Sequence, residues 1–416
     1  MFAAFSTALS ALDANGVAVN VVGNNLANLN TTGYKESETY FRDLVNESMG
    51  AGQTQIGFGV AQPLTLREFT QGAIQSSDGT LDAAIQGNGF FVVNDNGVTQ
   101  YTRAGSFQTD LNGNLITPTG EDVQGWMAVN GVVNTGGPIG NITMPLGSTE
   151  PPVATQNITL SANFDSSAAV GSASDWSAPV TVYDSLGNSH VLTMNFSETA
   201  ANTWSYTVTM PGADVTGGTA GTPYAIPGAS GTLTFNSSGQ LTSPAAGSPI
   251  TFSVNNLSDQ AATLNISWNP YSSSGAGMLT QFDQASAASA TTQDGSAAAQ
   301  LNSVTMGNGG QLLASYSNGQ QVVIGQLALA SIPNPQTLVA VGNNEYQVSA
   351  DTGQPAVGAP GTGGRGTIVG GALESSNVDM AGQLTDLIVL QSAYQANSKV
   401  VTTVDTLAQD TTNLIT

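Results

Sequence analysis

The sequence lacks cysteine altogether and has few charged residues of either sign. Without cysteine the chain can form neither a disulfide framework nor a thiolate metal site. Charged residues make up 8% of the chain, against about 25% in a typical globular protein. The formal net charge is −22, from 6 lysines and arginines against 28 aspartates and glutamates. Because nucleic acids and anionic membranes attract clustered cations, we expect neither to be a partner.

Basic residues are missing from the whole middle of the chain. Residues 104–364 contain neither lysine nor arginine. The basic residues that the chain does have are Lys35, Arg42, Arg67, Arg103, Arg365 and Lys399. No ion pair with lysine or arginine can therefore form inside the middle stretch, and its core must depend on apolar packing and hydrogen bonds.

Long apolar runs are absent as well. No stretch approaches the roughly 18 consecutive apolar residues of a membrane-spanning helix, so we expect no membrane insertion. The first 34 residues hold no lysine or arginine, and Asp13 and Asn15 interrupt the apolar run there. This pattern does not fit a Sec-type signal peptide. If the protein leaves the cell, we expect another export route and no cleaved signal.

The two ends of the chain carry the same kind of periodic pattern. Apolar and small residues recur at steps of three and four near the start, and every seven residues near the end. Such steps place side chains along one stripe of an α-helix, as in the seam of a coiled coil. The residues that we expect at these seams, and so at an assembly interface, are Phe5, Leu9, Leu12, Val19, Val22, Leu26, Leu387, Tyr394, Val401, Ala408 and Ile415.

The N-terminal helix is expected to be weak by itself. Gly16 and Gly23 each cost about 1 kcal/mol relative to alanine in a helix interior, so most of its stability must come from packing. Each apolar stripe could pack on its own β domain, or the two could pair within one monomer. The terminal positions and the weak helix favour packing between molecules. At the other end, Ser376 and Asp379 have the spacing of a capping box that opens the last helix.

Between the helices the pattern changes to a period of two with frequent turn residues, which is typical of β structure. We predict a multidomain chain in which terminal α-helices form a coiled-coil-like domain and the remainder forms nested all-β domains. The predicted parts are a terminal helical core domain (1–30 and 373–416), a polar, irregular connector (31–71), an inner β domain (72–147 and 288–372) and an inserted outer β domain (148–287).

Local composition supports this division. Residues 145–157 and the Ala/Ser-rich residues 284–300 resemble linkers. A simple string of three β domains is the alternative. If the two terminal helices pack together, however, the chain must run out and come back, which favours one β domain inserted within another. Within the inner β domain, residues 84–93 are a candidate strand pair. Residues 94–97 and 110–115 have the turn chemistry of hairpins.

Candidate catalytic residues are scarce. His190 is the one histidine, and Asp184 and Ser189 lie close to it in sequence. Local adjacency is not the geometry of a catalytic triad, so we expect a structural or exposed turn histidine. One histidine without cysteine also excludes a zinc site of the usual composition.

Other ligand motifs are weak. The glycine-rich residues 361–366 match a dinucleotide fingerprint as a string, but prolines precede them and no helix is expected after them. The dispersed carboxylates could make a glycosidase pair or a calcium site, yet no calcium-loop motif is present. We therefore predict no enzyme activity, no cofactor and no metal.

Several segments resemble the bacterial flagellar rod and hook family of axial proteins. They are Ser10–Asn15, Asn24–Lys35, Asp82–Phe91, Tyr101–Phe107, Leu373–Asp379 and Gln391–Asn397. The residues in these segments that match the family motifs are Asn15, Asn25, Ala27, Asn28, Thr32, Gly33, Tyr34, Lys35, Asn377, Asp379, Gln391, Tyr394 and Asn397.

Within that family, Ser161–Ser166 and Val182–Gly187 are similar to the inserted domain of hook members. The resemblance implies a self-assembling, curved tubular polymer outside the cell, with a central export channel, that acts as a universal joint between the rod and the filament. It also implies unfolded export through the flagellar type III apparatus, with copies of the chain, rod proteins, the hook cap and the hook–filament junction as partners. A distal rod subunit and a secreted β-rich binding protein or adhesin are the alternatives.

Overall fold

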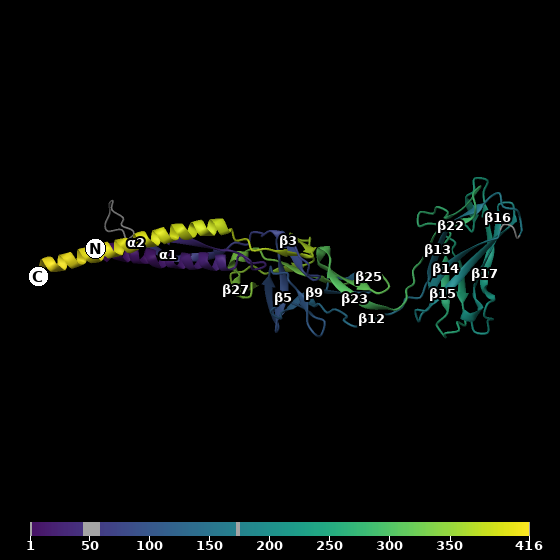
Figure 1. Cartoon of the computed structure of the whole chain (residues 1–416), viewed down its shortest axis with the longest axis horizontal. Coiled ribbons are helices and arrows are strands. Elements are labelled where there is room, and N and C mark those ends of the chain that lie inside the picture. The colour runs from purple at the N-terminus through teal and green to yellow at the C-terminus, as the bar shows by residue number, and fades with distance from the viewer. Residues whose placement is uncertain (1, 45–58, 172–174, 416) are drawn as a thin grey trace. The chain divides into compact units, whose positions relative to one another are not determined.

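The computed structural model describes the backbone of residues 2–44, 59–171 and 175–415, and the side chains of the same ranges except residues 2–3 and 412–415. By contacts the chain splits into two compact units. The first comprises Met1–Leu146, Ser303–Ser315 and Gln321–Thr416, and the second comprises Gly147–Asn302 and Tyr316–Gln320. Figure 1 labels the elements of both units along the chain.

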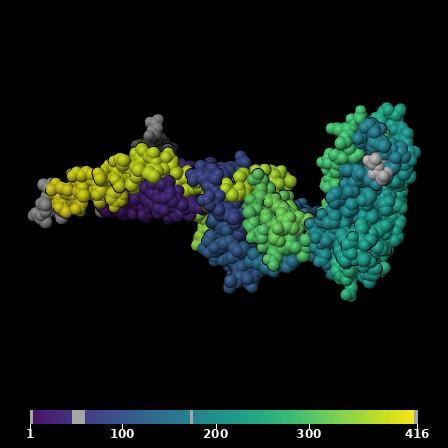
Figure 2. Space-filling model, turned by 45° about the vertical axis from the view of Figure 1, so that its right-hand side comes forward, coloured from purple at the N-terminus to yellow at the C-terminus, as the bar shows by residue number. Residues whose placement is uncertain are grey.

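The first unit contains both α-helices of the described residues. α1 (Phe2–Ala27) and α2 (Met380–Ile415) pack side by side, as the ribbon and the space-filling view both show (Figures 1 and 2). Gly16 and Gly23 lie inside α1 without ending it. Neither helix offers a stretch that is both long and apolar enough to cross a membrane.

The last helix begins differently from the capping box that the sequence predicts. Asp379 precedes the first residue of α2, and its Oδ1 accepts a hydrogen bond from the Ala381 N–H at 3.0 Å. Ser376 Oγ instead accepts a hydrogen bond from the Val378 N–H at 3.3 Å, before the helix begins. The capping-box prediction is therefore wrong in its register, because Asp379 is the N-cap and not the third helical residue.

Part of the predicted irregular connector is a pair of antiparallel strands, called the β1–β2 hairpin below. β1 (Ser37–Asp43) pairs antiparallel with β2 (Val60–Arg67), and both strands contact α1. The Val60 N–H donates to Ser10 Oγ at 3.2 Å, which ties the hairpin to the helix. These strands expose much of their side-chain surface, so no alternation of apolar and polar residues revealed them in the sequence.

The β part of the first unit is built mainly on one antiparallel path of strands in the order β24-β25-β9-β5-β6-β28-β27. The strands and short 3-10 helices of this part are β3 (Ile74–Ser76), β4 (Ala83–Gln86), β5 (Phe90–Asp95), β6 (Val98–Thr102), β7 (Gln108–Thr109), β8 (Leu115–Ile116), β9 (Asp122–Val129), β10 (Val132–Val133), β11 (Gly140–Asn141), η3 (Asn308–Gly310), β24 (Gln311–Tyr316), β25 (Gln321–Leu327), β26 (Leu329–Ser331), η4 (Pro335–Thr337), β27 (Val339–Gly342), β28 (Glu345–Gln347), β29 (Ala356–Gly358), β30 (Thr367–Gly370) and β31 (Ala372–Glu374).

The turn chemistry of this part follows the sequence in most places. Asn96 and Gly97 have φ angles of 50° and 92° in the β5–β6 hairpin, as its tight turn requires. Asp110 Oδ1 accepts hydrogen bonds from two backbone N–H groups of the β7–β8 turn. The strand pair predicted at residues 84–93 is wrong, however. β4 pairs with β30 and β5 pairs with β6, because the chain passes from one sheet to another at Gly87–Gly89.

The second unit is a sandwich of two five-stranded sheets. One sheet has the order β14-β15-β16-β17-β18, and the other has the path β19-β20-β13-β21 with β22 added to β13. The elements are β12 (Thr149–Glu150), β13 (Asn157–Asp165), β14 (Trp176–Tyr183), β15 (Ser189–Ala200), β16 (Thr203–Pro211), η2 (Gly212–Asp214), β17 (Pro223–Phe235), β18 (Leu241–Ser243), β19 (Ile250–Val254), β20 (Leu264–Trp268), β21 (Leu279–Phe282), β22 (Ala287–Gln293) and β23 (Ala299–Met306), the last of which ends in the first unit.

The core of the sandwich follows directly from strand periodicity. Along β13 every second side chain is buried, and the same alternation runs through β15 and β16. Phe164 lies at the centre, with its ring centroid 4.9 Å from that of Trp204 and 5.0 Å from that of Phe196. Phe164 and Trp204 are both completely buried. The sheets therefore hold each other through a closed aromatic core.

The Ala/Ser-rich segment 284–300 is not a simple linker. Residues Ala287–Gln293 form β22, which pairs antiparallel with β13 over most of its length. The side chains of β22 are almost all exposed, so the strand is stabilised by backbone hydrogen bonds and not by an apolar face. A composition without an apolar face is what made this segment resemble a linker.

Candidate functional site

The helix pair buries small side chains and leaves large ones exposed. On α1, the buried residues Ala14, Ala18 and Val22 follow one another at steps of four, which places them on one face. Small side chains on this face allow the elements that pack against α1 to approach it closely. Phe5 and Leu9, which the sequence predicts at the seam, are 39% and 45% exposed. The face that α1 uses within the chain is thus rotated away from part of the predicted seam.

On α2 the predicted seam residues lie in different environments. Leu387 and Val401 are half-buried, while Tyr394 and Ala408 are exposed. On α1, Leu12, Val19 and Leu26 are half-buried and Val22 is buried. The side chain of Ile415 lies outside the described residues. The large apolar side chains that α2 exposes are Met380, Leu384, Ile388, Val389, Tyr394, Val400 and Leu407.

This exposure is costly for an isolated chain. Ile388 and Val389 are 64% and 60% exposed, although they lie in the N-terminal half of a long helix. Apolar surface removed from water contributes about 25 cal/mol per Å². Met380, Leu384 and Ile388 follow one another at steps of four, so they form an exposed apolar stripe along α2. Exposed apolar surface of this kind is typical of a protein interaction site.

A buried amide joins both helices to the β1–β2 hairpin. Asn25 is 1% exposed, and its Nδ2 donates to the Ser37 carbonyl oxygen at 2.8 Å and to Gln383 Oε1 at 3.0 Å. Its Oδ1 accepts from the Ser37 N–H at 3.0 Å and from the Tyr34 hydroxyl at 3.2 Å. The amide makes all the hydrogen bonds that it can make, so any other residue at this position would lose some of them.

A second motif asparagine fixes the start of the C-terminal segment. Asn377 Oδ1 accepts from the Glu36 N–H at 2.7 Å. Its Nδ2 donates to the Glu68 carbonyl oxygen at 2.9 Å and to Thr70 Oγ1 at 3.0 Å. Residues more than 300 positions apart in the sequence are therefore held together just before α2 begins.

An ion cluster lies beside these amides and is completely buried. Glu374 Oε1 lies 2.6 Å from Lys35 Nζ, and Oε2 lies 3.4 Å from Arg103 Nη1. Lys35 Nζ also donates to the Thr70 carbonyl oxygen at 2.6 Å. Burial lowers the pKa of Lys35, and the charge of Glu374 opposes that shift. The Arg103 guanidinium lies 5.2 Å from the centre of the Phe90 ring, which gives it a cation–π contact.

The remaining motif residues have local roles or remain exposed. Gly33 has a φ of 69°, and a Cβ there would lie 2.6 Å from the Ala104 backbone nitrogen, so only glycine fits. Asn15 is buried in α1, and the Thr32 carbonyl oxygen accepts from Asn344 Nδ2. Asn28 Nδ2 donates to the Asn24 carbonyl oxygen at the end of α1, and Asn397 Nδ2 donates to the Ala393 carbonyl oxygen within α2. Ala27 and Gln391 are exposed.

The sequence did not reveal the ion cluster, although it named one of its members. From the sequence, Lys35 is a motif residue and Arg103 is one of six basic residues, and no site role is predicted for Arg103 or Glu374. All three lie inside motif segments, and they are rare charges in a chain that is poor in charge. A rare charge inside a motif was the signal that could have found them.

The other candidate sites from the sequence do not form catalytic arrangements. His190 is buried and contacts Asp184, while Ser189 is exposed. The glycine-rich residues 361–366 lead into β30, whereas a dinucleotide site would need a helix there.

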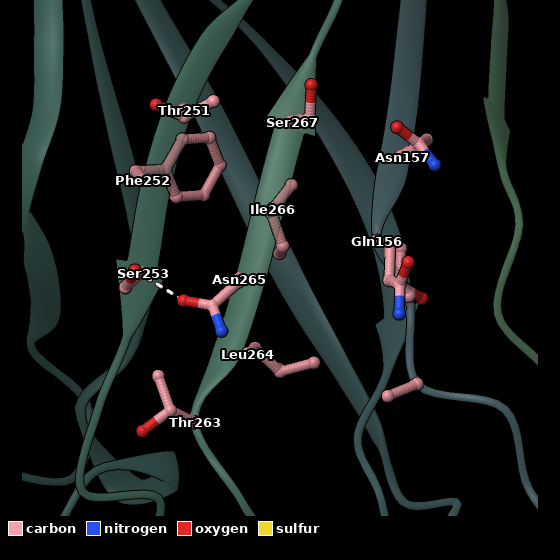
Figure 3. A pocket seen from close by; sticks show the side chains of 12 residues that line it. Gln156, Asn157, Thr251, Phe252, Ser253, Thr263, Leu264, Asn265, Ile266 and Ser267 are labelled. Carbon is pink, nitrogen blue, oxygen red and sulfur yellow. Dashed lines mark hydrogen bonds between the residues drawn. The ribbon is translucent and has the colours of Figure 1, made fainter.

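The second unit also has a surface cavity of about 670 Å³ between β19, β20 and the start of β13 (Figure 3). Its lining consists of hydroxyl, amide and apolar side chains, with a hydrogen bond of 2.7 Å from Ser253 Oγ to Asn265 Oδ1. None of the lining residues is acidic, basic or histidine. The cavity therefore provides no general acid or base.

Family models match both ends and the middle of the chain. The model of the flagellar hook protein FlgE/F/G D1 domain matches residues 84–163, and that of the flagellar basal body protein FlaE D2 domain matches residues 146–296. The flagella basal body rod protein model matches residues 5–35, and the flagellar basal body rod FlgEFG protein C-terminal model matches residues 369–414.

Curated relatives extend over the whole chain. The flagellar hook protein FlgE of Borreliella burgdorferi is 32% identical and covers 100% of both chains. The flagellar hook protein FlgE of Escherichia coli is also 32% identical, over 99% of this chain and 100% of that one. The chain belongs to the flagellar hook protein family.

Family membership decides the class of function. The chain is a structural, non-enzymatic subunit of the bacterial flagellar hook, and it assembles with other axial components of the flagellum. The distal rod and adhesin alternatives are not favoured. Among solved structures, the crystal structure of Helicobacter pylori flagellar hook protein FlgE2 covers 71% of this chain and 99% of that chain, with a TM-score of 0.53 at 15% identity, and so shares its fold.

Proposed function

We propose that the subunit polymerises through its terminal helices into a curved tube that acts as a universal joint between the rod and the filament. The observation that carries the proposal is the contrast between buried small residues and exposed large apolar residues on the helix pair. Leu384, Ile388 and Val389 are exposed in the monomer and so contribute little hydrophobic stabilisation there. Their burial between neighbouring subunits would stabilise the polymer.

The terminal helical core domain, residues 1–30 and 373–416, is the proposed assembly unit. Its helices would pack with those of neighbouring copies as a coiled coil, with Leu12, Tyr394 and Val401 among the contacts. The buried amides and the ion cluster support this role because they fix where both helices leave the β structure. Packed around an axis, the helices would line the central channel.

The proposed partners follow from the position of the tube between the rod and the filament. Copies of the chain would form the tube, rod proteins would meet its lower end, and the hook cap and hook–filament junction proteins would meet its upper end. The subunits would reach this place outside the cell in unfolded form through the flagellar type III apparatus, without a cleaved signal.

Electron microscopy of the purified full-length protein, concentrated in high salt, tests the proposal. Salt screens the repulsion that a formal net charge of −22 creates between subunits. We expect curved tubes from the unchanged chain and none from Leu384→Glu or Tyr394→Glu. Leu111→Glu is the matched control, because Leu111 is fully exposed at a hairpin turn and lies far from both helices in sequence.

The electron microscopy results test the helix interface and the curvature of the tube separately. Tubes from the Leu384→Glu and Tyr394→Glu variants would show that the helix faces do not form the interface. Straight, stiff tubes from the unchanged chain would contradict the universal joint but not the interface. Circular dichroism of the variants shows whether their β structure is intact, so that misfolding is not mistaken for loss of assembly.

A further inference from the structure

The one histidine of the chain is buried among three carboxylates. His190 lies in β15 and is 5% exposed. Its Nε2 lies 3.2 Å from Asp184 Oδ2 and 3.5 Å from Asp259 Oδ2, and its Nδ1 lies 3.1 Å from Asp214 Oδ2. Ionised carboxylates accept hydrogen bonds and cannot donate them. Both ring nitrogens therefore need a proton to satisfy these contacts, which makes the ring an imidazolium.

The three carboxylates come from three separate segments of the second unit. Asp184 lies in the β14–β15 turn, Asp214 in η2, and Asp259 in the connection between β19 and β20. Asn188 Nδ2 lies 3.3 Å from Asp184 Oδ2 and 3.0 Å from Asp259 Oδ2, so it donates to the same pair of acids. His190 is the group that contacts all three segments.

Backbone hydrogen bonds show that these segments form one structural element. The Ser258 N–H donates to the Asp214 carbonyl oxygen at 2.9 Å, and the Thr216 N–H donates to the Asn256 carbonyl oxygen at 2.8 Å. The Ala262 N–H donates to Ser185 Oγ at 2.9 Å. The three loops thus meet at one end of the sandwich, around the histidine.

No other cation can balance the three acids from within this part of the chain. Residues 104–364 contain neither lysine nor arginine. The charged groups that face His190 are therefore Asp184, Asp214 and Asp259. A single proton decides whether this cluster contains a cation.

We propose that His190 is a pH-operated latch, whose imidazolium joins residues 184–188, 212–216 and 255–262 and whose deprotonation in alkaline solution releases them. When the ring loses a proton, one nitrogen lone pair faces a carboxylate oxygen. A hydrogen bond between opposite charges then becomes a repulsive contact in a buried place.

The direction of the pH dependence follows from the surroundings of the ring. Burial alone would lower the pKa of His190, but its hydrogen bonds to Asp214 and Asp184 outweigh burial and raise the pKa above 6.5. The stability that the latch contributes is therefore fully present below pH 6.5, and it is lost as the pH rises through the raised pKa.

Strong acid opens the latch from the other side. Burial would raise the pKa of Asp184, but hydrogen bonds from the Asn188 backbone N–H and from His190 help to outweigh it and hold the pKa at about 2. The contribution of Asp184 is present above its ordinary pKa of 3.8 and is lost as the pH falls towards 2. The latch is closed between these limits.

Nuclear magnetic resonance of the full-length protein tests the latch without any mutation. Because the chain has one histidine, labelling with ¹³C,¹⁵N-histidine gives one imidazole spin system, which needs no assignment. We expect both ring nitrogens to carry protons at pH 7 and the titration midpoint to lie above 6.5. A neutral ring at pH 7, or a midpoint at or below 6.5, would overturn the proposal.

Hydrogen exchange followed by mass spectrometry tests the mechanical consequence. After correction for the intrinsic pH dependence of exchange, the three loop segments of the unchanged protein should exchange at least tenfold faster at pH 9.5 than at pH 6. His190→Gln should show the fast exchange already at pH 6, since glutamine has no charge to lose. Asp283→Asn is the matched control, because Asp283 is exposed in the same unit, and it should behave like the unchanged protein.

The second experiment can also fail in a decisive way. If His190→Gln protects the loops at pH 6 as well as histidine does, the imidazolium is not what holds them. If His190→Gln does not fold, the titration of the unchanged protein still decides the protonation state, and Asp214→Asn should lower its midpoint.

Discussion

The two units of this chain treat apolar side chains in opposite ways. In the second unit Phe164 and Trp204 are completely buried, and the strands alternate strictly between buried and exposed residues. In the helices of the first unit, Ile388 and Val389 are more than half exposed. One unit buries its large apolar side chains within the chain, whereas the helices leave several of theirs exposed. The proposed assembly through the helices would account for this difference.

The units also treat charge differently. The first unit buries Lys35, Arg103 and Glu374 together where the two helices meet the β structure. The second unit has no lysine or arginine within residues 147–302 and uses His190 in their place. The first arrangement pairs a carboxylate with a lysine and an arginine, while the second depends on a proton on histidine.

The largest expected loss of stability comes from a substitution in the closed core of the second unit. Phe164→Ala should cost about 3–5 kcal/mol, since it removes the central ring of an aromatic cluster and leaves a cavity. Urea unfolding followed by tryptophan fluorescence measures the loss, because Trp176, Trp204 and Trp268 lie in this unit. The matched variant Phe164→Leu should lose less. Equal losses from the two variants would contradict a tightly packed core.

The next effect tests the ion cluster of the first unit. Glu374→Gln leaves two buried cations without a counter-charge and should cost about 3 kcal/mol, near the lower limit for breaking a buried ion pair. Asp351→Asn, at an exposed position, is the control. Urea unfolding followed by circular dichroism of the helices gives the difference. A loss no larger than that of the control would show that Lys35 and Arg103 find other partners.

A smaller, pH-dependent effect on stability is expected at two neighbouring acids of the first unit, Glu345 and Glu121. Burial and the neighbouring Glu121 raise the pKa of Glu345 to about 8. An acid whose pKa is raised on folding contributes stability below its unfolded pKa of 4.5, and that contribution is lost as the pH rises through 8. Glu345→Gln should therefore be about 1–2 kcal/mol more stable than the unchanged protein at pH 9.

The comparison across pH contains its own control. At pH 5 Glu345 is protonated in the folded state, so the unchanged protein and Glu345→Gln should have similar urea midpoints. Because His190 is present in both proteins, its titration cancels in the difference. A difference in urea midpoint that is the same at pH 5 and pH 9 would exclude a proton shared with Glu121.

The smallest expected effect on the monomer is at the helix surface. Ile388→Ser should change the free energy of unfolding by less than about 0.5 kcal/mol, because the side chain is largely exposed. The same change should raise the protein concentration at which tubes form, as measured by sedimentation. A large loss of monomer stability would mean that Ile388 is buried within the chain in solution.

Sequence patterns predicted the elements whose signal is local. The two helices, the turns at residues 94–97 and 110–115, and the alternating strands of the second unit each depend on residues that are close together in the chain. β1, β2 and β22 were missed because their side chains are mostly exposed and carry no apolar period. Strands held by backbone hydrogen bonds leave little trace in a sequence.

The sites were harder to predict than the elements. Lys35 and Glu374 are 339 positions apart, and nothing in either neighbourhood identifies the other. The same is true of His190 and Asp259, which meet only because the β14–β15 turn and the β19–β20 connection lie together. The seam pattern predicted two helices with apolar stripes, but it did not predict that α1 buries its alanines and leaves Phe5 and Leu9 exposed.

The absence of lysine and arginine from residues 104–364 has a consequence for proteolysis. Trypsin cleaves only after these two residues, so it has no site anywhere in the second unit. Even complete digestion of the unfolded chain leaves one large peptide that contains the whole sandwich. In the folded chain, the burial of Lys35 and Arg103 protects two further sites. A tryptic digest therefore releases the second unit unbroken, and the peptides that appear first report on the exposed basic residues near the two ends.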